Sequence, residues 1–88
     1  MKLISVKPFK DYLLEIQFDD KKYGLFDVSP YLSLEAFQPL KRESEFKQVH
    51  NGGYFIEWPC GADLSADTIE AHLIGFSSQK NDSFVKMK

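Results

Sequence analysis

The sequence predicts an α+β domain in which two antiparallel β-hairpins and an N-terminal edge strand form a small sheet, packed with one C-terminal helix. Three observations predict this fold. Apolar and polar residues alternate along residues 12–18, Asn51-Gly52-Gly53 separates two aromatic-containing stretches, and Ser65 precedes a short amphipathic segment. Alternation is typical of a strand, Asn-Gly of a hairpin, and serine before an apolar stripe of a helix start.

Residues 3–28 are predicted to form the edge strand and the first hairpin. The segment LISV at 3–6 is followed by Pro8, and it is expected at a sheet edge because proline cannot donate to a β-ladder. The polar run DDKK at 19–22 suits a loop between the strands 12–18 and 23–28. One face of the first of these strands carries Tyr12, Leu14, Ile16 and Phe18.

Prolines interrupt the middle of the chain, where we expect a turn, one helical turn near Leu34–Phe37, and a loop laid over the core. Residues 44–58 are then predicted to form the second hairpin, with Asn51–Gly53 as its loop. A three-residue loop is favoured over a two-residue one by the cross-strand pairs it creates. These pairs are Phe46 with Trp58, Lys47 with Glu57, and Val49 with Phe55.

A helix is predicted to follow the second hairpin. The Ser65 hydroxyl can accept from first-turn amides, and the buried stripe is expected to contain Ile69 and Leu73, four residues apart. His72 falls in the expected last turn, where a positive charge favours the helix dipole, and Gly75 is the expected stop.

The length of 88 residues allows one domain, which we predict to span residues 1–76. Aromatic residues make up 15% of the chain, enough to build a core without disulfides. Residues 77–88 are polar and are predicted to be a flexible tail, although Phe84 and Val85 could pair with a sheet edge or a partner.

The composition also limits the compartment and the ligand. Cys60 is the only cysteine, so a disulfide-stapled secreted scaffold is not expected. The sequence has no apolar run long enough to span a bilayer, and we expect a cytoplasmic protein that does not bind membranes. The net charge of −2 argues against nucleic acid as a direct ligand, because phosphate binding needs a positive surface.

The candidates for chemistry are weak, and we predict no enzyme, no cofactor and no metal. Cys60 could be a nucleophile with His50 or His72 as base and Asp63 as orienter, but no helix start directly follows the cysteine and His50 falls at the hairpin tip. The same residues lack metal-ligand spacing. Carboxylates for acid–base catalysis could come from Asp19, Asp20, Glu57 and Asp63, which are more typical of solvated loops and ion pairs.

The aromatic residues of the second hairpin suggest a surface for a partner. Tyr54, Ile56 and Trp58 share one face of the predicted strand, and Phe55 lies on the other. One reading is that the loop at residues 31–40 covers the second face. The other is that part of this surface contacts a protein, because exposed apolar patches with Tyr and Trp are typical of interfaces.

The order and spacing of several short motifs resemble the "domain of unknown function 2442" family of small bacterial proteins. The resemblance covers roughly residues 6–73. It is carried by YLLEIQF, YGLFDVSPYL, AFQPLKRESEFKQV and IEWPCGADLSADTI. The most telling residues are Asp27, Pro30, Phe37, Leu40, Phe46, and Trp58 running into Gly61-Ala62-Asp63-Leu64.

The resemblance implies no catalytic residues, and the stretch from Trp58 to Ser65 is interpreted as a structural join in which Gly61 makes the bend and Asp63 and Ser65 accept from amides. Relatives are often encoded beside a small putative toxin, which implies an antitoxin-like role. Others carry a C-terminal helix-turn-helix domain that this sequence lacks, which argues against direct DNA binding. We therefore expect a module that occludes a small partner protein. The alternative is a regulatory or ligand-sensing domain that acts through homo-oligomerisation.

Overall fold

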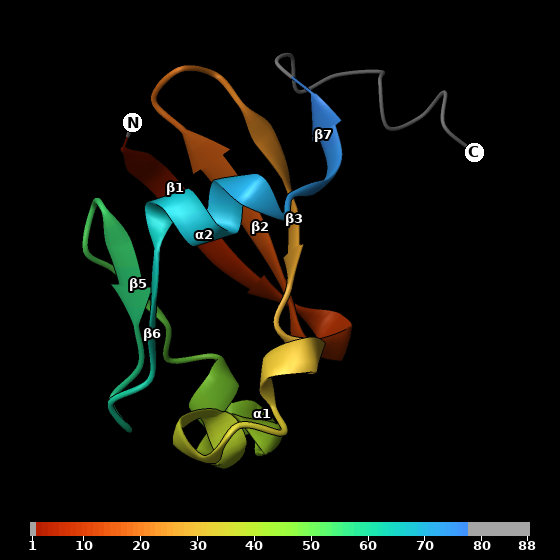
Figure 1. The fold of residues 1–88 in the computed structure, drawn as a ribbon, viewed down its shortest axis with the longest axis vertical. Coiled ribbons are helices and arrows are strands. Elements are labelled where there is room, and N and C mark those ends of the chain that lie inside the picture. The colour runs from red at the N-terminus through yellow and green to blue at the C-terminus, as the bar shows by residue number, and fades with distance from the viewer. Residues whose placement is uncertain (1, 78–88) are drawn as a thin grey trace.

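The computed structural model describes residues 2–77, which form two antiparallel sheets with short helices between and around them (Figure 1). The first sheet, sheet A, has four strands in the order β1-β2-β3-β7. The second, sheet B, has three strands in the order β4-β5-β6. The α+β class is therefore confirmed, but the prediction of one small sheet is wrong, because the second hairpin belongs to a separate sheet.

Sheet A confirms the predicted first hairpin and edge strand. Its strands are β1 (Leu3–Phe9), β2 (Leu13–Phe18), β3 (Tyr23–Asp27) and β7 (Ile74–Ser77). The alternating side chains Leu14, Ile16 and Phe18 are fully buried. Strand β1 continues through Pro8, beyond its predicted end, because an edge strand needs no hydrogen bonds on its open side.

The middle of the chain is more helical than its sequence predicts. It forms the 3-10 helices η2 (Ser29–Tyr31) and η3 (Glu35–Lys41) and the α-helical turn α1 (Glu43–Phe46). Phe37, Leu40 and Phe46 are the buried residues of η3 and α1. These short helices form the end of the molecule at the foot of Figure 1 and bring their aromatic side chains into the core.

The predicted register of the second hairpin is wrong. Strand β4 is only His50–Asn51, and it pairs with β5 (Phe55–Glu57) so that His50 faces Glu57 and Asn51 faces Ile56. Phe46 reaches the core from α1 instead of pairing with Trp58 across strands. Cross-strand pair preferences therefore carried less weight than burial of the Phe46 ring.

The helix α2 (Ala66–Ala71) begins where predicted and ends earlier. The Ser65 hydroxyl accepts a 3.1 Å hydrogen bond from the Thr68 amide, as expected for an N-cap. The chain leaves the helix at His72, and Gly75 lies inside β7 instead of stopping the helix. The helix is thus not C-terminal, because β7 follows it and pairs with β3.

The core lies between the inner faces of the two sheets, α2 and the short helices. Ala66 and Ile69 of α2 belong to the same buried cluster as the inward side chains of β2. A continuous series of ring contacts, with centroids 5.4–6.3 Å apart, crosses the core. In order, the rings are Tyr12, Phe46, Trp58, Phe37, Tyr31 and Phe26.

The predicted tail begins at Ser77, which is the last residue of β7. Residues 78–88, including Phe84 and Val85, lie outside the described residues.

Candidate interaction surface on the second hairpin

The structure divides the predicted partner surface into a buried part and an exposed part. Ile56 and Trp58 are 0% and 2% exposed, so the prediction that they contact a partner is wrong. Tyr54 is 65% exposed and Phe55 is 39% exposed, and both remain available on the surface. Phe84 and Val85 cannot be placed, because they lie outside residues 2–77.

Trp58 is buried because the middle of the chain folds over it. Its ring packs against Phe37 of η3 and Phe46 of α1, and its indole Nε1 donates a 2.9 Å hydrogen bond to the Phe46 carbonyl. The reading that residues 31–40 cover the second face, which carries Phe55, is not confirmed: Phe37 of this segment packs on Trp58, and Phe55 stays 39% exposed. Ile56 and Trp58 point to the covered face, whereas Phe55 points outward.

The stretch from Trp58 to Ser65 is a tight loop followed by a strand. The Trp58 amide donates to the Ala62 carbonyl at 2.9 Å, and the Gly61 amide donates to the Trp58 carbonyl at 2.9 Å. Gly61 has a φ of 102°, which a residue with a side chain rarely adopts. This loop leads directly into β6 (Asp63–Ser65).

Asp63 differs from its predicted role. Within residues 2–77 its carboxylate accepts no hydrogen bond, and it lies exposed on β6 opposite Glu57. Of the two residues expected to accept hydrogen bonds from backbone amides, only Ser65 does so. The sequence reasoning missed β6 because it treated residues 63–65 as a bend, although their polar-apolar-polar pattern is that of a strand.

The tip of the second hairpin is fastened to the first strand of sheet A. The Asn51 side-chain amide donates to the Leu3 carbonyl at 3.1 Å, and the Leu3 amide donates to the Gly53 carbonyl at 2.7 Å. The Asn51 side-chain oxygen also accepts from the Gly53 amide at 2.8 Å. Tyr54 follows directly, and its carbonyl accepts from the Ala66 amide of α2 at 2.9 Å. These hydrogen bonds fix the backbone next to the exposed side chains of Tyr54 and Phe55.

Phe55 lies against the hairpin backbone. A methyl group on Gly52 would come within 2.4 Å of the Phe55 ring, so the ring can occupy this position only because residue 52 is glycine. Across the sheet, Phe55 faces Ser65.

Next to the aromatic residues, three ionisable side chains form a row across sheet B. His50, Glu57 and Asp63 occupy directly opposed positions on β4, β5 and β6, and all three are exposed. Glu57 and Asp63 form a cross-strand pair of like charge, which is unfavourable for the isolated sheet. Hereafter the hairpin surface means Tyr54, Phe55, Glu57 and Asp63.

The structure brings three of the predicted catalytic candidates together, because His50 and Asp63 lie on either side of Glu57 across sheet B. Cys60 is exposed in the loop before β6. His72 follows α2, and its Nδ1 lies 3.0 Å from the Thr68 carbonyl. The His72 side chain lines a hollow of about 350 Å³ that does not contain Cys60. Among residues 2–77, no group of three His, Cys, Asp or Glu side chains is placed to hold a metal ion.

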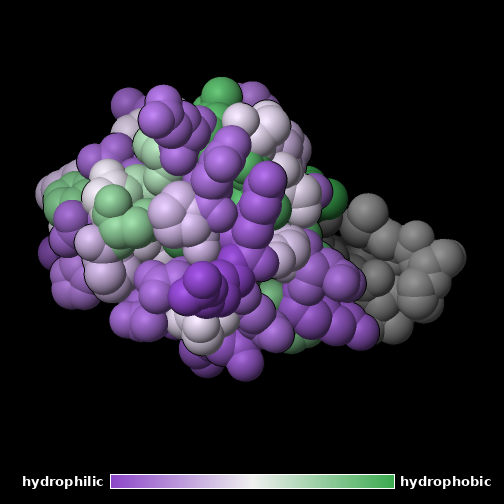
Figure 2. All heavy atoms as spheres, turned by 90° about the horizontal axis from the view of Figure 1, so that it is seen from below, coloured by the Kyte–Doolittle hydropathy of each residue, from purple (hydrophilic) through white to green (hydrophobic). Residues whose placement is uncertain are grey.

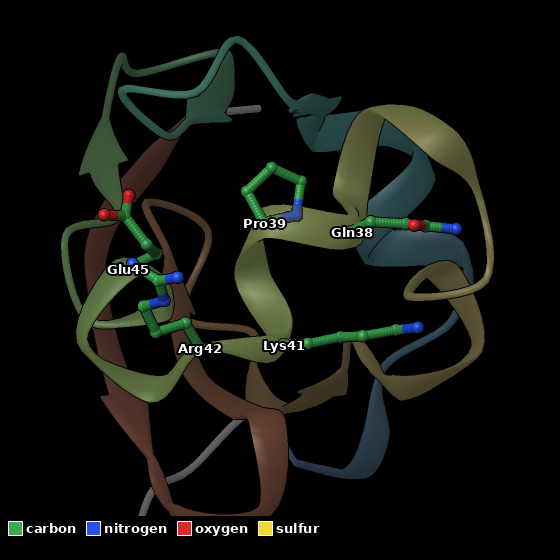
Figure 3. A pocket seen from close by; sticks show the side chains of 5 residues that line it. All are labelled: Gln38, Pro39, Lys41, Arg42 and Glu45. Atoms are coloured by element: carbon green, nitrogen blue, oxygen red, sulfur yellow. The ribbon is translucent and has the colours of Figure 1, made fainter.

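A hollow of about 550 Å³ lies over η3 and α1 and lacks convergent polar groups. In Figure 3, Gln38 and Lys41 extend in one direction, whereas Arg42 and Glu45 lie together on the other side of Pro39. The face of the molecule at this end is mainly hydrophilic, with hydrophobic residues toward its margins (Figure 2). Such an open, solvated hollow is not typical of a small-molecule site.

Two polar contacts shift the pKa of the groups that form them. The hydrogen bond from Lys22 to Glu70 raises the pKa of the Lys22 ammonium group and joins the first hairpin to α2. Burial, together with a hydrogen bond to Glu15, raises the pKa of the Tyr23 phenol to about 12. Both contacts lie away from the hairpin surface and connect structural elements.

Together, fold and surface define a small α+β protein that presents an aromatic and acidic hairpin. The chain belongs to the DUF2442 family, which is described as a protein of unknown function, and the family model matches residues 3–75. No curated protein and no solved structure matches the chain. None of the helices within residues 2–77 has the length and apolar character needed to cross a bilayer.

Proposed function

We propose that this protein is a non-catalytic binding module that contacts a small basic protein through the hairpin surface. One observation carries the proposal: the exposed Phe55 shares the outward face of β5 and β6 with an acidic cross-strand pair, Glu57 and Asp63, and the exposed Tyr54 directly precedes β5. Aromatic anchors supply most of the binding energy in many interfaces, and opposite charges select the partner.

The acidic pair indicates the charge of the partner. Glu57 and Asp63 repel each other in the free protein, and their side chains have no lysine or arginine bonded to them within residues 2–77. A lysine or arginine placed between the two carboxylates would relieve this repulsion and gain charge-assisted hydrogen bonds. A basic partner therefore fits this surface better than a neutral or acidic one.

The fixed backbone of the hairpin also favours binding. Hydrogen bonds from Asn51 to Leu3 and from Ala66 to Tyr54 hold the tip against sheet A and α2. A surface that is already ordered loses little conformational entropy when a partner docks.

An antitoxin-like role follows if the basic partner is a nuclease. The active surface of a nuclease is positive because it binds phosphates, so an acidic and aromatic surface could cover it and exclude its substrate. The family resemblance supports this role through the small putative toxins encoded beside relatives. We place the protein in the cytoplasm as part of the same proposal.

The proposal is tested by co-purifying the full chain from its native host and then measuring the affinity of the isolated partner by calorimetry. We expect a stoichiometric small basic protein. Replacing Phe55 with serine or Glu57 with lysine should weaken binding at least about tenfold, because each change removes an anchor or reverses a charge. An isolated protein without a stoichiometric partner would contradict the proposal.

Two control variants separate this surface from general surface effects. Leu34→Ser removes an apolar side chain that is 51% exposed on another part of the molecule, and Glu35→Lys reverses an exposed charge on η3. Both should retain the affinity of the unmodified chain. Equal losses in the controls and in the hairpin variants would refute the role of the hairpin surface.

A further inference from the structure

A second exposed surface lies on the outer face of sheet A. The side chains of β2 that point inward are fully buried, and those that alternate with them point to the opposite side of the sheet. We define the outer face by the exposed or half-buried residues that share this side. They are Ser5, Lys7 and Phe9 of β1, Leu13, Glu15 and Gln17 of β2, Leu25 and Asp27 of β3 and Ile74 of β7.

The outer face is exposed at its two edge strands, β1 and β7, whereas its middle is half-buried and includes the buried Tyr23. Helix α2 packs on the opposite side, where Ala66 and Ile69 join the core. Phe9 is 53% exposed and Ile74 is 50% exposed, although both are large apolar residues. An apolar sheet face with this exposure is typical of an interface.

The register of β1 and β2 makes the outer face complementary to itself. Lys7 lies directly opposite Glu15, and in the next outward row Phe9 lies directly opposite Leu13. Lys7 takes part in no ion pair within residues 2–77, whereas Glu15 accepts from the Tyr23 hydroxyl. A carboxylate can accept further hydrogen bonds, so Glu15 remains able to bind a cation.

We propose that this face binds a second copy of the chain to form a twofold homodimer. In this dimer the twofold axis lies between the two packed sheets, runs parallel to the strands, and passes midway between β1 and β2. It therefore places β1 of each copy over β2 of the other, with directly opposed residues at the same height along the strands. It places Lys7 of each copy over Glu15 of the other, and Phe9 of each copy over Leu13 of the other. This is the isologous arrangement expected of a closed dimer, in which β1 and β2 of the two copies pack face to face and β3 and β7, with Leu25 and Ile74, lie beside the overlap.

Charge complementarity selects a second copy as the occupant. On β1 and β2 the outer face carries one cation, Lys7, and one anion, Glu15, in paired positions, so these two strands satisfy both charges when they meet their own copy. The third charged residue of this side, Asp27, lies on β3. The hairpin surface, by contrast, carries two opposed carboxylates and would repel its own copy. The two surfaces lie on different sheets, so self-association through the outer face goes beyond the proposed binding of a basic partner and does not depend on it.

The test is sedimentation equilibrium of the full chain over a range of concentrations, without any partner. We expect a monomer–dimer equilibrium. Phe9→Ser should raise the dimer dissociation constant at least about tenfold, because it removes an apolar contact twice in each dimer. Leu34→Ser, which removes a comparably exposed side chain outside the outer face, should leave the constant unchanged.

A charge exchange tests the predicted geometry. Lys7→Glu should weaken the dimer, because each new carboxylate then faces Glu15 of the other copy. Adding Glu15→Lys in the same chain should restore association, with circular dichroism used to verify that the fold is retained without the Glu15–Tyr23 hydrogen bond. Failure of the folded double variant to recover would overturn the proposed pairing.

Two other results would overturn the proposal as a whole. One is a chain that stays monomeric at every concentration. The other is a chain that dimerises only after residues 78–88 are deleted, which would make the chain's own C-terminal segment the occupant of the outer face. Neither result depends on the hairpin surface, so the two proposals can fail separately.

Discussion

The indole Nε1 of Trp58 donates a 2.9 Å hydrogen bond to the backbone carbonyl of Phe46, and the two rings stack with their centroids 6.3 Å apart. This contact joins the loop after β5 to α1, twelve residues earlier in the chain. It explains why the only tryptophan of the protein is part of the core, since a buried indole needs an acceptor for its N–H group.

Replacing Trp58 with phenylalanine should destabilise the protein by about 2–4 kcal/mol. The change creates a cavity among Phe37 and Phe46 and removes the hydrogen bond to the Phe46 carbonyl. The measurement is chemical denaturation followed by far-ultraviolet circular dichroism, because the variant lacks the fluorescent indole. Tyr54→Phe, a change at a 65% exposed ring, should cost less than about 0.5 kcal/mol. A similar loss in both variants would contradict a structural role specific to Trp58.

Replacing Ser65 with alanine should cost about 1 kcal/mol of stability. The change leaves the Thr68 amide without the side-chain acceptor that begins α2. Ser65→Asp retains an acceptor oxygen and places a negative charge at the positive end of the helix, so it should remain close to the unmodified protein. Thermal denaturation of the three proteins measures the difference, and an equally large loss in the aspartate variant would argue against capping.

Replacing Gly61 with alanine should destabilise the protein by about 1–3 kcal/mol through backbone strain alone. Gly61 has a φ of 102°, yet a methyl group there would meet no atom within 4 Å. A β-branched residue tolerates this conformation less well than alanine, so Gly61→Val should cost more. Denaturation midpoints of the two variants test this order. Full stability of Gly61→Val would show that the loop can relax.

Tyr23 should make the stability of the protein depend on pH under alkaline conditions. Its pKa rises from 10.0 to about 12 in the folded protein because the phenol is buried and bonded to Glu15. The folded state therefore favours the protonated phenol. Its contribution is fully present below pH 10 and is lost as the pH rises toward 12, by at most about 2–3 kcal/mol.

The check for Tyr23 is the free energy of unfolding measured at several pH values between 9 and 12, in the unmodified chain and in Tyr23→Phe. The unmodified chain should lose more stability over this range, because the variant has no phenol to ionise at this position. Lys22 titrates in both proteins, so the difference between them isolates Tyr23. Parallel curves would contradict a perturbed phenol.

The sequence by itself determined those structural features that depend only on residues close together in the chain. The alternation in residues 12–18 predicted β2 and its buried side, because one residue pattern can place its apolar groups on only one face of a strand. Tyr12 was wrongly included in the strand, since it ends the preceding 3-10 helix. Ser65 predicted the start of α2 because capping uses an amide only three residues away. The family resemblance was also correct over most of the chain.

Only the tertiary structure decided which aromatic residues of the second hairpin reach the surface. The alternation in residues 54–58 separates two faces but does not say which is covered; Phe37 and Phe46 cover the Trp58 side and leave Phe55 outside. The pairing of Glu57 with Asp63 and the self-complementary outer face likewise depend on strand register. Register and coverage arise from contacts between segments distant in the chain, which local patterns cannot specify.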